Sequence, residues 1–220
     1  MTRDLKQTTK TAMSRHPERG SRDRALAFAI LDEAMVAHVG VDTGDGVQVL
    51  PMTYARIDDC LFLHGAVASR WLGSFEGGRE VCVCVTLLDG IVLARSACSH
   101  SMNYRSVIAH GTATVVTDVA RKQAAFRAFL DHLVPGRWED TRQPNRKEVA
   151  ATTVLALELD EASVKLRSGP PADAAADLDQ PFWAGVLPLA LTCATAVPDP
   201  AMAEAREIPA YLQNYRRPGR

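Results

Sequence analysis

Three segments of the chain combine residue types and spacings that suit binding of an anion or a polar cofactor. The first reads Leu50-Pro-Met-Thr-Tyr54 and places a proline inside an apolar run with strand character. Because proline cannot donate to a β-ladder, backbone groups beside it should be available to a ligand. This segment therefore predicts a strand that is interrupted at an edge or a bulge.

The second segment reads His64-Gly-Ala-Val-Ala-Ser-Arg-Trp-Leu72, where a predicted strand ends at a glycine and a helix begins beside a Ser-Arg pair. Free N–H groups at a helix start, together with a hydroxyl and a guanidinium, can hold a phosphate. The alternative interpretation is a capped helix with a surface arginine. The third segment, Ser96-Ala-Cys-Ser-His-Ser-Met-Asn-Tyr-Arg-Ser-Val107, is a polar loop that either forms a site or is simply surface.

Other chemistry-bearing motifs are absent from the sequence. It has no G-x-G-x-x-G, no P-loop, no H-E-x-x-H and no G-x-S-x-G motif. Cys82 and Cys84 have the spacing of a metal pair, but they alternate with valines, so we expect packed core thiols and no metal site. The scattered histidines are expected to be half-buried and hydrogen-bonded; four of them are His38, His64, His100 and His110.

Composition excludes several classes of protein. Lys and Arg total 25 against 26 Asp and Glu, which excludes a broadly basic nucleic-acid-binding domain. No apolar stretch reaches the roughly 18 residues of a spanning helix, and the N-terminus lacks the apolar core of a secretory signal. The five cysteines are an odd number and do not suggest a disulfide framework. We therefore expect a cytoplasmic protein with no membrane and no nucleic-acid partner.

The elements that must position these segments are mostly short strands. Ser21 is the expected cap of a first helix, Asp89-Gly90 has the chemistry of a hairpin turn, and Asp118 should cap a later amphipathic helix. Strands at hairpin spacing favour a closed antiparallel barrel over an α/β layered fold. Helices are expected over 21–35, 66–75 and from 118 to about Pro135, and strands over 36–42, 47–55, 60–65, 80–90, 91–97, 106–118 and 151–160.

Five motifs, in order, carry a resemblance to a known family. They are Arg15-His-Pro-Glu-Arg-Gly20, His64-Gly-Ala-Val-Ala-Ser-Arg70, Val85-Thr-Leu-Leu-Asp-Gly-Ile-Val-Leu-Ala-Arg-Ser96, Ser101-Met-Asn-Tyr-Arg-Ser-Val107 and Trp183-Ala-Gly-Val-Leu-Pro-Leu189. From about Arg15 to Pro200 the chain resembles the flavin-nucleotide-binding branch of the pyridoxamine 5′-phosphate oxidase-like family, which includes nitroimidazole-resistance reductases. The resemblance implies a fold that is mainly β with flanking helices, an FMN-binding split β-barrel, which forms a homodimer with the flavin at the subunit interface.

The same resemblance implies a set of cofactor-binding residues. The phosphate segment matches His64, Ser69 and Arg70, and a C-terminal motif that closes over the site matches Trp183. No catalytic residue is implied. The strand along the flavin ring matches Pro51, Met52, Thr53 and Tyr54; the central hairpin matches Thr86 and Leu87; and the following loop matches Asn103, Tyr104, Arg105 and Ser106.

With the resemblance, the chain divides into three parts. Residues 1–20 are expected to be a mobile basic N-terminal arm, and residues 21–169 the split-barrel flavin-binding domain. Residues 170–220 begin with the acidic, Ala- and Pro-rich connector PPADAAADLDQP. This last part is expected to pack on the barrel or on the partner subunit.

Two functions from different classes remain open. One is an FMN-dependent oxidoreductase, in which the flavin reduces or oxidises a small organic substrate and the protein supplies position and electrostatics. The other is a non-catalytic module that binds flavin or haem. In the haem case an axial ligand would come from one of four histidines: His38, His64, His100 or His110.

Overall fold

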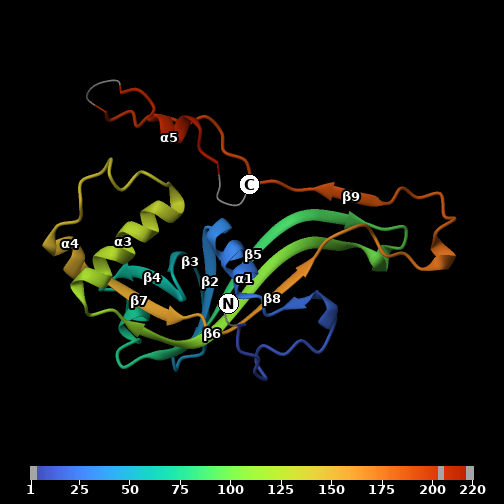
Figure 1. Ribbon diagram of the computed structural model, residues 1–220, viewed down its shortest axis with the longest axis horizontal. Coiled ribbons are helices and arrows are strands. Elements are labelled where there is room, and N and C mark those ends of the chain that lie inside the picture. The colour runs from blue at the N-terminus through green and yellow to red at the C-terminus, as the bar shows by residue number, and fades with distance from the viewer. Residues whose placement is uncertain (1–3, 203–205, 217–220) are drawn as a thin grey trace.

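The computed structural model describes residues 4–202 and 206–216 and folds them into antiparallel strands flanked by short helices (Figure 1). The strands are β1 (Gly20–Ser21), β2 (Val36–Asp42), β3 (Val47–Ile57), β4 (Cys60–Ala66), β5 (Arg79–Leu93), β6 (Ser101–Val115), β7 (Thr152–Glu158), β8 (Glu161–Arg167) and β9 (Gly185–Pro188). The helices are α1 (Arg24–Glu33), α2 (Arg70–Gly73), α3 (Val119–Leu133), α4 (Arg146–Ala151) and α5 (Ala210–Gln213), with 3₁₀ turns at Pro17–Arg19, Ala97–Ser99 and Ala175–Asp177.

Strand pairing closes a ring. Hydrogen-bonded neighbours follow the order β1-β8-β6-β7-β4-β3-β2-β5-β9, and β5 also pairs with β6. This last pairing joins β5, β6, β7, β4, β3 and β2 into a closed circuit. β5 and β6 stay paired from Arg79 opposite Ala113 to Val92 opposite Ser101, and Figure 1 shows them leaving the ring as a long curved arm. The expected fold class, mainly β with flanking helices, is confirmed.

The main core fills the inside of this ring. β5 contributes Val81, Val83 and Val85, which alternate with outward-facing residues because successive side chains of a strand point to opposite faces. Helix α1 packs Ile30 and Leu31 into the same core. Trp71 and Leu72 of α2 join the same core, which is therefore built from alternate strand residues and from side chains of two helices.

Helix α1 begins later than the sequence predicts. The side chain of Asp23, not Ser21, accepts hydrogen bonds from the backbone N–H groups of Ala25 and Leu26. Capping by Asp23 satisfies two of the unpaired donors at the helix start, so the first helical residue is Arg24.

A second apolar cluster lies outside the ring, beneath α3. Ala125 and Phe129 of α3 pack on Ala55 of β3, Phe62 of β4 and Val154 of β7. The helix therefore covers one side of the ring only. Outward-facing apolar side chains beyond the reach of α3 stay exposed, namely those of Val36, Val47, Val49, Leu88 and Met102.

The two strand cysteines also face outward. Cys82 and Cys84 are half-buried, and His38 of β2 lies directly opposite Cys84. The expectation of packed core thiols is wrong because the intervening valines occupy the inward positions. Among the residues that the structure describes, no cluster of three or more His, Cys, Asp or Glu side chains could hold a metal ion.

Asp89 and Gly90 do not form the predicted hairpin turn. They lie inside β5, where the register with β6 shifts between Leu88 and Gly90. A Cβ on Gly90 would lie 3.0 Å from Val186 Cγ1 and 3.2 Å from Leu187 O of β9. The glycine is needed for close approach of a neighbouring strand, not for a reversal of the chain.

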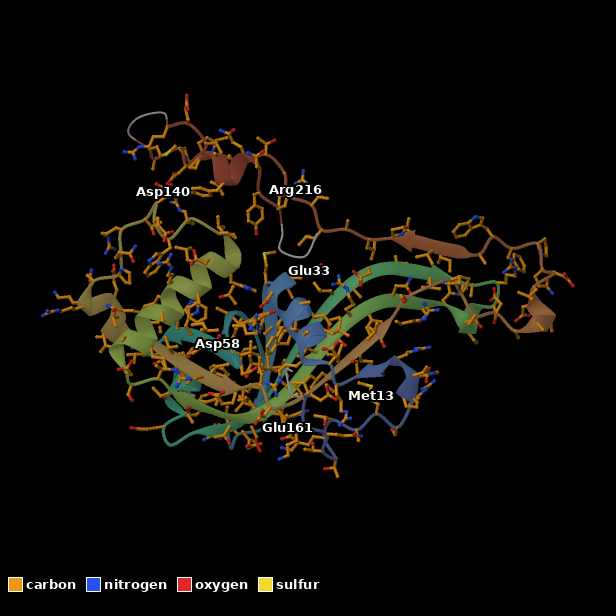
Figure 2. All side chains as sticks on the ribbon, viewed as in Figure 1. Met13, Glu33, Asp58, Asp140, Glu161 and Arg216 are labelled. Carbon is orange, nitrogen blue, oxygen red and sulfur yellow. The ribbon has the colours of Figure 1, made fainter. Side chains whose placement is uncertain are left out.

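The C-terminal segment runs along the arm and then back toward α3. After β9 pairs with the edge of β5, residues 189–202 carry largely exposed side chains. α5 is fastened beyond this stretch, where Tyr215 Oη donates to Leu133 O at 2.6 Å and Tyr211 Oη to Asp140 Oδ2 at 2.6 Å. Figure 2 shows Asp140 beside this C-terminal helix.

The N-terminal segment, for which the sequence predicts a mobile arm, contacts the sheet from residue 5 onward. Leu5 is buried, its backbone N–H donates to Arg22 O, and Lys6 N–H donates to Asp160 O at 2.8 Å. None of the helices in the described ranges is long and apolar enough to cross a membrane.

Candidate functional site

An open groove of about 480 Å³ lies between the ends of β3 and β4, the helix α3 and the segment that leads into α4. Two predicted site residues, Thr53 and His64, line it. Most of the remaining lining is apolar or aromatic, with one ion pair. Its residues are Phe126, Phe129, Leu130, Leu133, Trp138, Thr141, Arg142, Pro144 and Glu148.

His64 is the titratable group at the strand side of this groove. Its ring lies 4.2 Å, centroid to centroid, from the ring of Phe129. Nδ1 is buried and has no hydrogen-bond partner among the described residues. Burial lowers the pKa of His64, because the charged imidazolium loses hydration there. The side chain is thus a neutral imidazole near pH 7 and can offer a nitrogen lone pair to a metal.

The other three histidines considered as haem ligands lie elsewhere. His38 and His100 are exposed, and His110 is half-buried on β6. The His100 ring is 3.0 Å from Ser96 O. None of the three lines either cavity found in the described part of the chain.

The predicted phosphate segment has available polar groups. Ser69 is the residue before α2, and its hydroxyl caps no helix N–H. Arg70 is exposed, and no ion pair to it exists within the described residues. α2 itself has only four residues, Arg70–Gly73, and is shorter than the helix expected over 66–75. A hydroxyl and a free guanidinium are nevertheless in place for an anionic group.

The predicted flavin strand splits between two faces. Tyr54 is fully buried, with its Oη 2.5 Å from Leu31 O and 3.1 Å from Ala34 O, and Met52 packs against the core. Pro51 is exposed and Thr53 reaches the groove. Because strand side chains alternate, only Pro51 and Thr53 present side chains to a ligand outside the ring.

The predicted residues of β5 and β6 lie together on the arm. Thr86 is opposite Ser106, Leu87 is opposite Arg105, and Tyr104 is opposite Leu88. Alternation again divides them: Leu87, Asn103 and Arg105 point to the buried side, while Thr86, Tyr104 and Ser106 lie on the other face. Asn103 Nδ2 donates to Gly169 O at 3.2 Å.

Arg105 is held by two carboxylates. Its Nε and Nη2 donate to Asp89 at 2.9 and 2.8 Å, and both Nη atoms donate to Glu33 at the end of α1. Only 3% of the Glu33 side chain is exposed. The hydrogen bonds that Arg105 donates to Asp89 and, next in size, to Glu33 raise the pKa of Arg105, so it stays charged. Figure 2 shows Glu33 directed toward the arm.

In one chain the predicted residues therefore form two separate groups. The first consists of Pro51, Thr53, His64 and the start of α2, near α3. The second lies on the β5–β6 arm, beyond β2, where exposed Trp183 comes just before β9. The Trp183 ring covers its own backbone, since a Cβ on Gly185 would be 2.8 Å from Trp183 Cη2.

Sequence reasoning missed the residues that form the other wall of the groove. The apolar face of α3 was predicted, but as a packing face, and Phe126 and Leu133 also line the groove. Trp138, Arg142 and Glu148 belong to no sequence motif. They lie near His64 only because α3, which precedes them, packs on β3 and β4. A larger cavity of about 1130 Å³, between the end of α3 and the described residues of 196–202 and 206–212, has no predicted site residue in its lining.

Comparisons with known proteins give one family match and a consistent set of similar structures. A family model described as pyridoxamine 5′-phosphate oxidase matches residues 23–166. A comparison with curated proteins found no match.

Two solved structures are similar over nearly the whole chain. The flavocytochrome Anf3 from Azotobacter vinelandii is 36% identical with a TM-score of 0.89, and the match covers 95% of this chain and 97% of that one. The FAD and haem binding protein from Mycobacterium smegmatis is 34% identical with a TM-score of 0.84, over 89% of this chain and 96% of that one. A protein from Bacteroides thetaiotaomicron described as a 5-nitroimidazole antibiotic resistance protein shares the fold at 22% identity and a TM-score of 0.56, over 66% and 85% of the two chains.

The carboxylate contacts of Arg105 predict a structural role. Arg105→Gln removes the ion pairs that Arg105 forms with buried Glu33 and with Asp89, and we expect it to lower the free energy of unfolding by about 2–4 kcal/mol in urea titration. Arg127→Gln is the matched control, because Arg127 pairs with Asp131 and Glu139 on an exposed helix face and should cost less than about 1 kcal/mol. Equal losses in the two variants would contradict the structural role.

Proposed function

Because the chain belongs to the pyridoxamine 5′-phosphate oxidase family, we propose that it binds a flavin and acts as an oxidoreductase on a small organic substrate. The observation that supports this most is 36% identity over 95% of the chain to a flavocytochrome. The resemblance of the motifs favours FMN, while the relative from Mycobacterium smegmatis binds FAD. The flavin supplies the redox chemistry, and the chain supplies position and charge.

The flavin phosphate is assigned to the start of α2. The Ser69 hydroxyl and the Arg70 guanidinium are polar groups at the end of a strand with no partner in the described ranges. A guanidinium forms charge-assisted pairs with phosphate oxygens. Arg105, in contrast, already donates to Glu33 and Asp89, so its part in the flavin site is to fix β6 against α1 and β5.

We place the flavin between two copies of the chain. The predicted residues fall into two groups on either side of β2, and a two-fold dimer is the commonest closed assembly. Apolar side chains on the outer faces of β2 and β3 support the same assembly: Val47 is 76% exposed and Val49 is 62% exposed. In this arrangement the arm of one copy supplies Thr86, Tyr104 and Ser106, and the other copy supplies the start of α2 with Arg70.

A haem in the groove is a second cofactor supported by a specific observation. Two relatives with more than 30% identity are described as haem proteins, one of them as a flavocytochrome. The groove beside His64 fits such a group, since it has an aromatic and aliphatic lining and a neutral imidazole without a hydrogen-bond partner at Nδ1. His64 would hold the iron, and Phe129 against its ring would fix the imidazole plane. A bound haem supplies one-electron chemistry next to the two-electron flavin.

The flavin assignment predicts the effect of one substitution. Arg70→Ala should weaken FMN or FAD binding to the stripped protein by about ten- to a hundredfold, because a charge-assisted contact to phosphate is lost. Quenching of flavin fluorescence measures the affinity, and the flavin released from the purified protein identifies FMN or FAD. Arg127→Ala is the control and should bind as the parent does. Unchanged affinity of Arg70→Ala would show that the phosphate lies elsewhere.

The dimer assignment predicts a solution mass of about twice the 23.9 kDa chain by light scattering. Val49→Glu places a charge on the bare sheet face and should shift the protein toward monomer and release flavin together. Trp183→Ala should keep the dimer and weaken flavin binding if Trp183 covers the site. A monomer that binds flavin as tightly as the parent would refute the interface position.

The haem assignment predicts a sharpened Soret band, shifted from that of free haemin, when haemin is added to the protein, and the loss of this altered band in His64→Ala. Free imidazole should restore the band in that variant by filling the space of the missing ring. Binding should weaken as the pH falls below the ordinary histidine value of about 6.5, because burial lowers the pKa of His64 and only its protonation at lower pH removes the ligand. His110→Ala is the control; the same shifted Soret band in His64→Ala would exclude His64 as the ligand.

A further inference from the structure

The rim of the groove carries an ion pair whose two members are anchored very differently. Arg142 Nη2 donates to Glu148 Oε1 at 2.6 Å, and Nη1 donates to Glu148 Oε2 at 3.0 Å. Both residues line the groove, and 69% of the Arg142 side chain is exposed. The pair therefore lies at the mouth of the groove, in front of an apolar interior.

Glu148 has a second anchor that does not depend on Arg142. Its Oε2 also accepts the backbone N–H of Asn145 at 2.7 Å, while Asn145 Oδ1 accepts the N–H of Glu148 at 3.0 Å. This reciprocal pair is a capping box at the start of α4, so the carboxylate is fixed to the helix. Hydrogen bonds from Arg142 and from the Asn145 backbone lower the pKa of Glu148 to about 2, which keeps it an anion.

Arg142 has weaker ties to the rest of the chain. Besides Glu148, its only hydrogen-bond partner among the described residues is the backbone oxygen of Gln143, at 2.9 Å. An exposed ion pair of this kind contributes little to stability, because water screens it. The guanidinium can therefore leave Glu148 at small cost when another carboxylate is offered.

The groove interior lacks a second cation for such a carboxylate. Its described lining contains Arg142 as the one permanently charged basic side chain, beside His64, which is neutral near pH 7. The rest of the interior is dominated by Phe126, Phe129 and Trp138, which suit a flat apolar body. A ligand with a planar apolar core and a carboxylate at its edge would match this groove. The core would lie against the aromatic interior, and the carboxylate would reach Arg142 at the mouth.

We propose that Arg142 is the specificity-determining residue of the groove, exchanging its bond to Glu148 for a carboxylate of a planar, apolar ligand. The inference rests on the proposed haem site, since a haem carries two propionate groups on a flat apolar ring. Arg142 then selects and orients the ligand at the mouth, while Glu148 acts as the resident competitor that occupies the guanidinium in the empty groove. Exchange replaces a screened pair with one at the edge of an apolar, partly dehydrated surface, where charge-assisted bonds are stronger.

The test compares haemin with its dimethyl ester, which has the same ring and iron but no carboxylates. Full-length protein is titrated with each by absorbance, and with metal-free protoporphyrin by quenching of tryptophan fluorescence. The parent should bind haemin about tenfold more tightly than the ester. Arg142→Gln should lose that preference by weakening haemin binding alone. Glu148→Gln should strengthen haemin binding a fewfold, because glutamine can still complete the capping box but competes less for the guanidinium.

The outcomes separate this inference from the haem proposal. A preference for haemin that survives in Arg142→Gln overturns the role of Arg142 while leaving a haem site intact. Loss of preference in Arg142→Gln, together with undiminished binding in His64→Ala, supports Arg142 and refutes His64 as the iron ligand. Absence of any porphyrin binding by the parent refutes both. Arg127→Gln removes another exposed arginine, one that does not line the groove, and should behave as the parent.

Discussion

Closure of the ring by the β5–β6 pairing is the constraint on which the rest of the structure depends. Once β5 is paired with both β2 and β6, each strand residue faces either the shared core or the outside. The inward set of strand side chains, mostly Val, Leu and Ala, fixes the register, because a slip of one residue would turn this set out to water. Everything that can meet a ligand must then come from the outward positions or from the strand ends. Helix α3 covers the outside of β3, β4 and β7, and the groove forms where that cover ends.

The same constraint explains how far the sequence could predict the molecule. Period-two patterns predicted β2, β3, β4 and β7 within a residue or two, whereas β1, β8 and β9 were not predicted; the motif resemblance predicted the family. Asp89-Gly90 misled the prediction, because local turn chemistry cannot reveal that Gly90 is needed for the approach of β9, almost a hundred residues later. The prediction that Cys82 and Cys84 are core residues failed for a different reason. In a strand made only of apolar residues, the sequence does not show which alternate set of side chains faces inward. The groove could not be predicted at all, since Trp138 and Arg142 reach His64 only through the tertiary packing of α3.

His64 bears on both proposed cofactors, the flavin and the haem. The motif assigns it to a phosphate segment together with Ser69 and Arg70, but its side chain lies against Phe129 in the groove. A histidine that binds phosphate should be charged, whereas burial lowers the pKa of this one and favours the neutral form. A neutral imidazole suits iron better than it suits an anion. The physical chemistry of the side chain thus separates it from Ser69 and Arg70, the residues beside it in the sequence to which we assign the phosphate.

Three arginines show how burial and prior partners decide what one residue type can do. Arg105 is bound by two carboxylates, one of them almost fully buried, so a ligand could recruit it only by breaking both ion pairs, at a large cost in free energy. Arg142 has one exposed partner that is independently anchored, so it can change partners at little cost. Arg70 has no ion-pair partner in the described part of the chain and is free for an anion from the outset. Motif matching gives Arg70 and Arg105 equal standing as cofactor contacts, yet the free energy needed to release each guanidinium differs widely. Ligand recognition should therefore fall to the two arginines that the fold leaves loosely held, while the third maintains the geometry on which they depend.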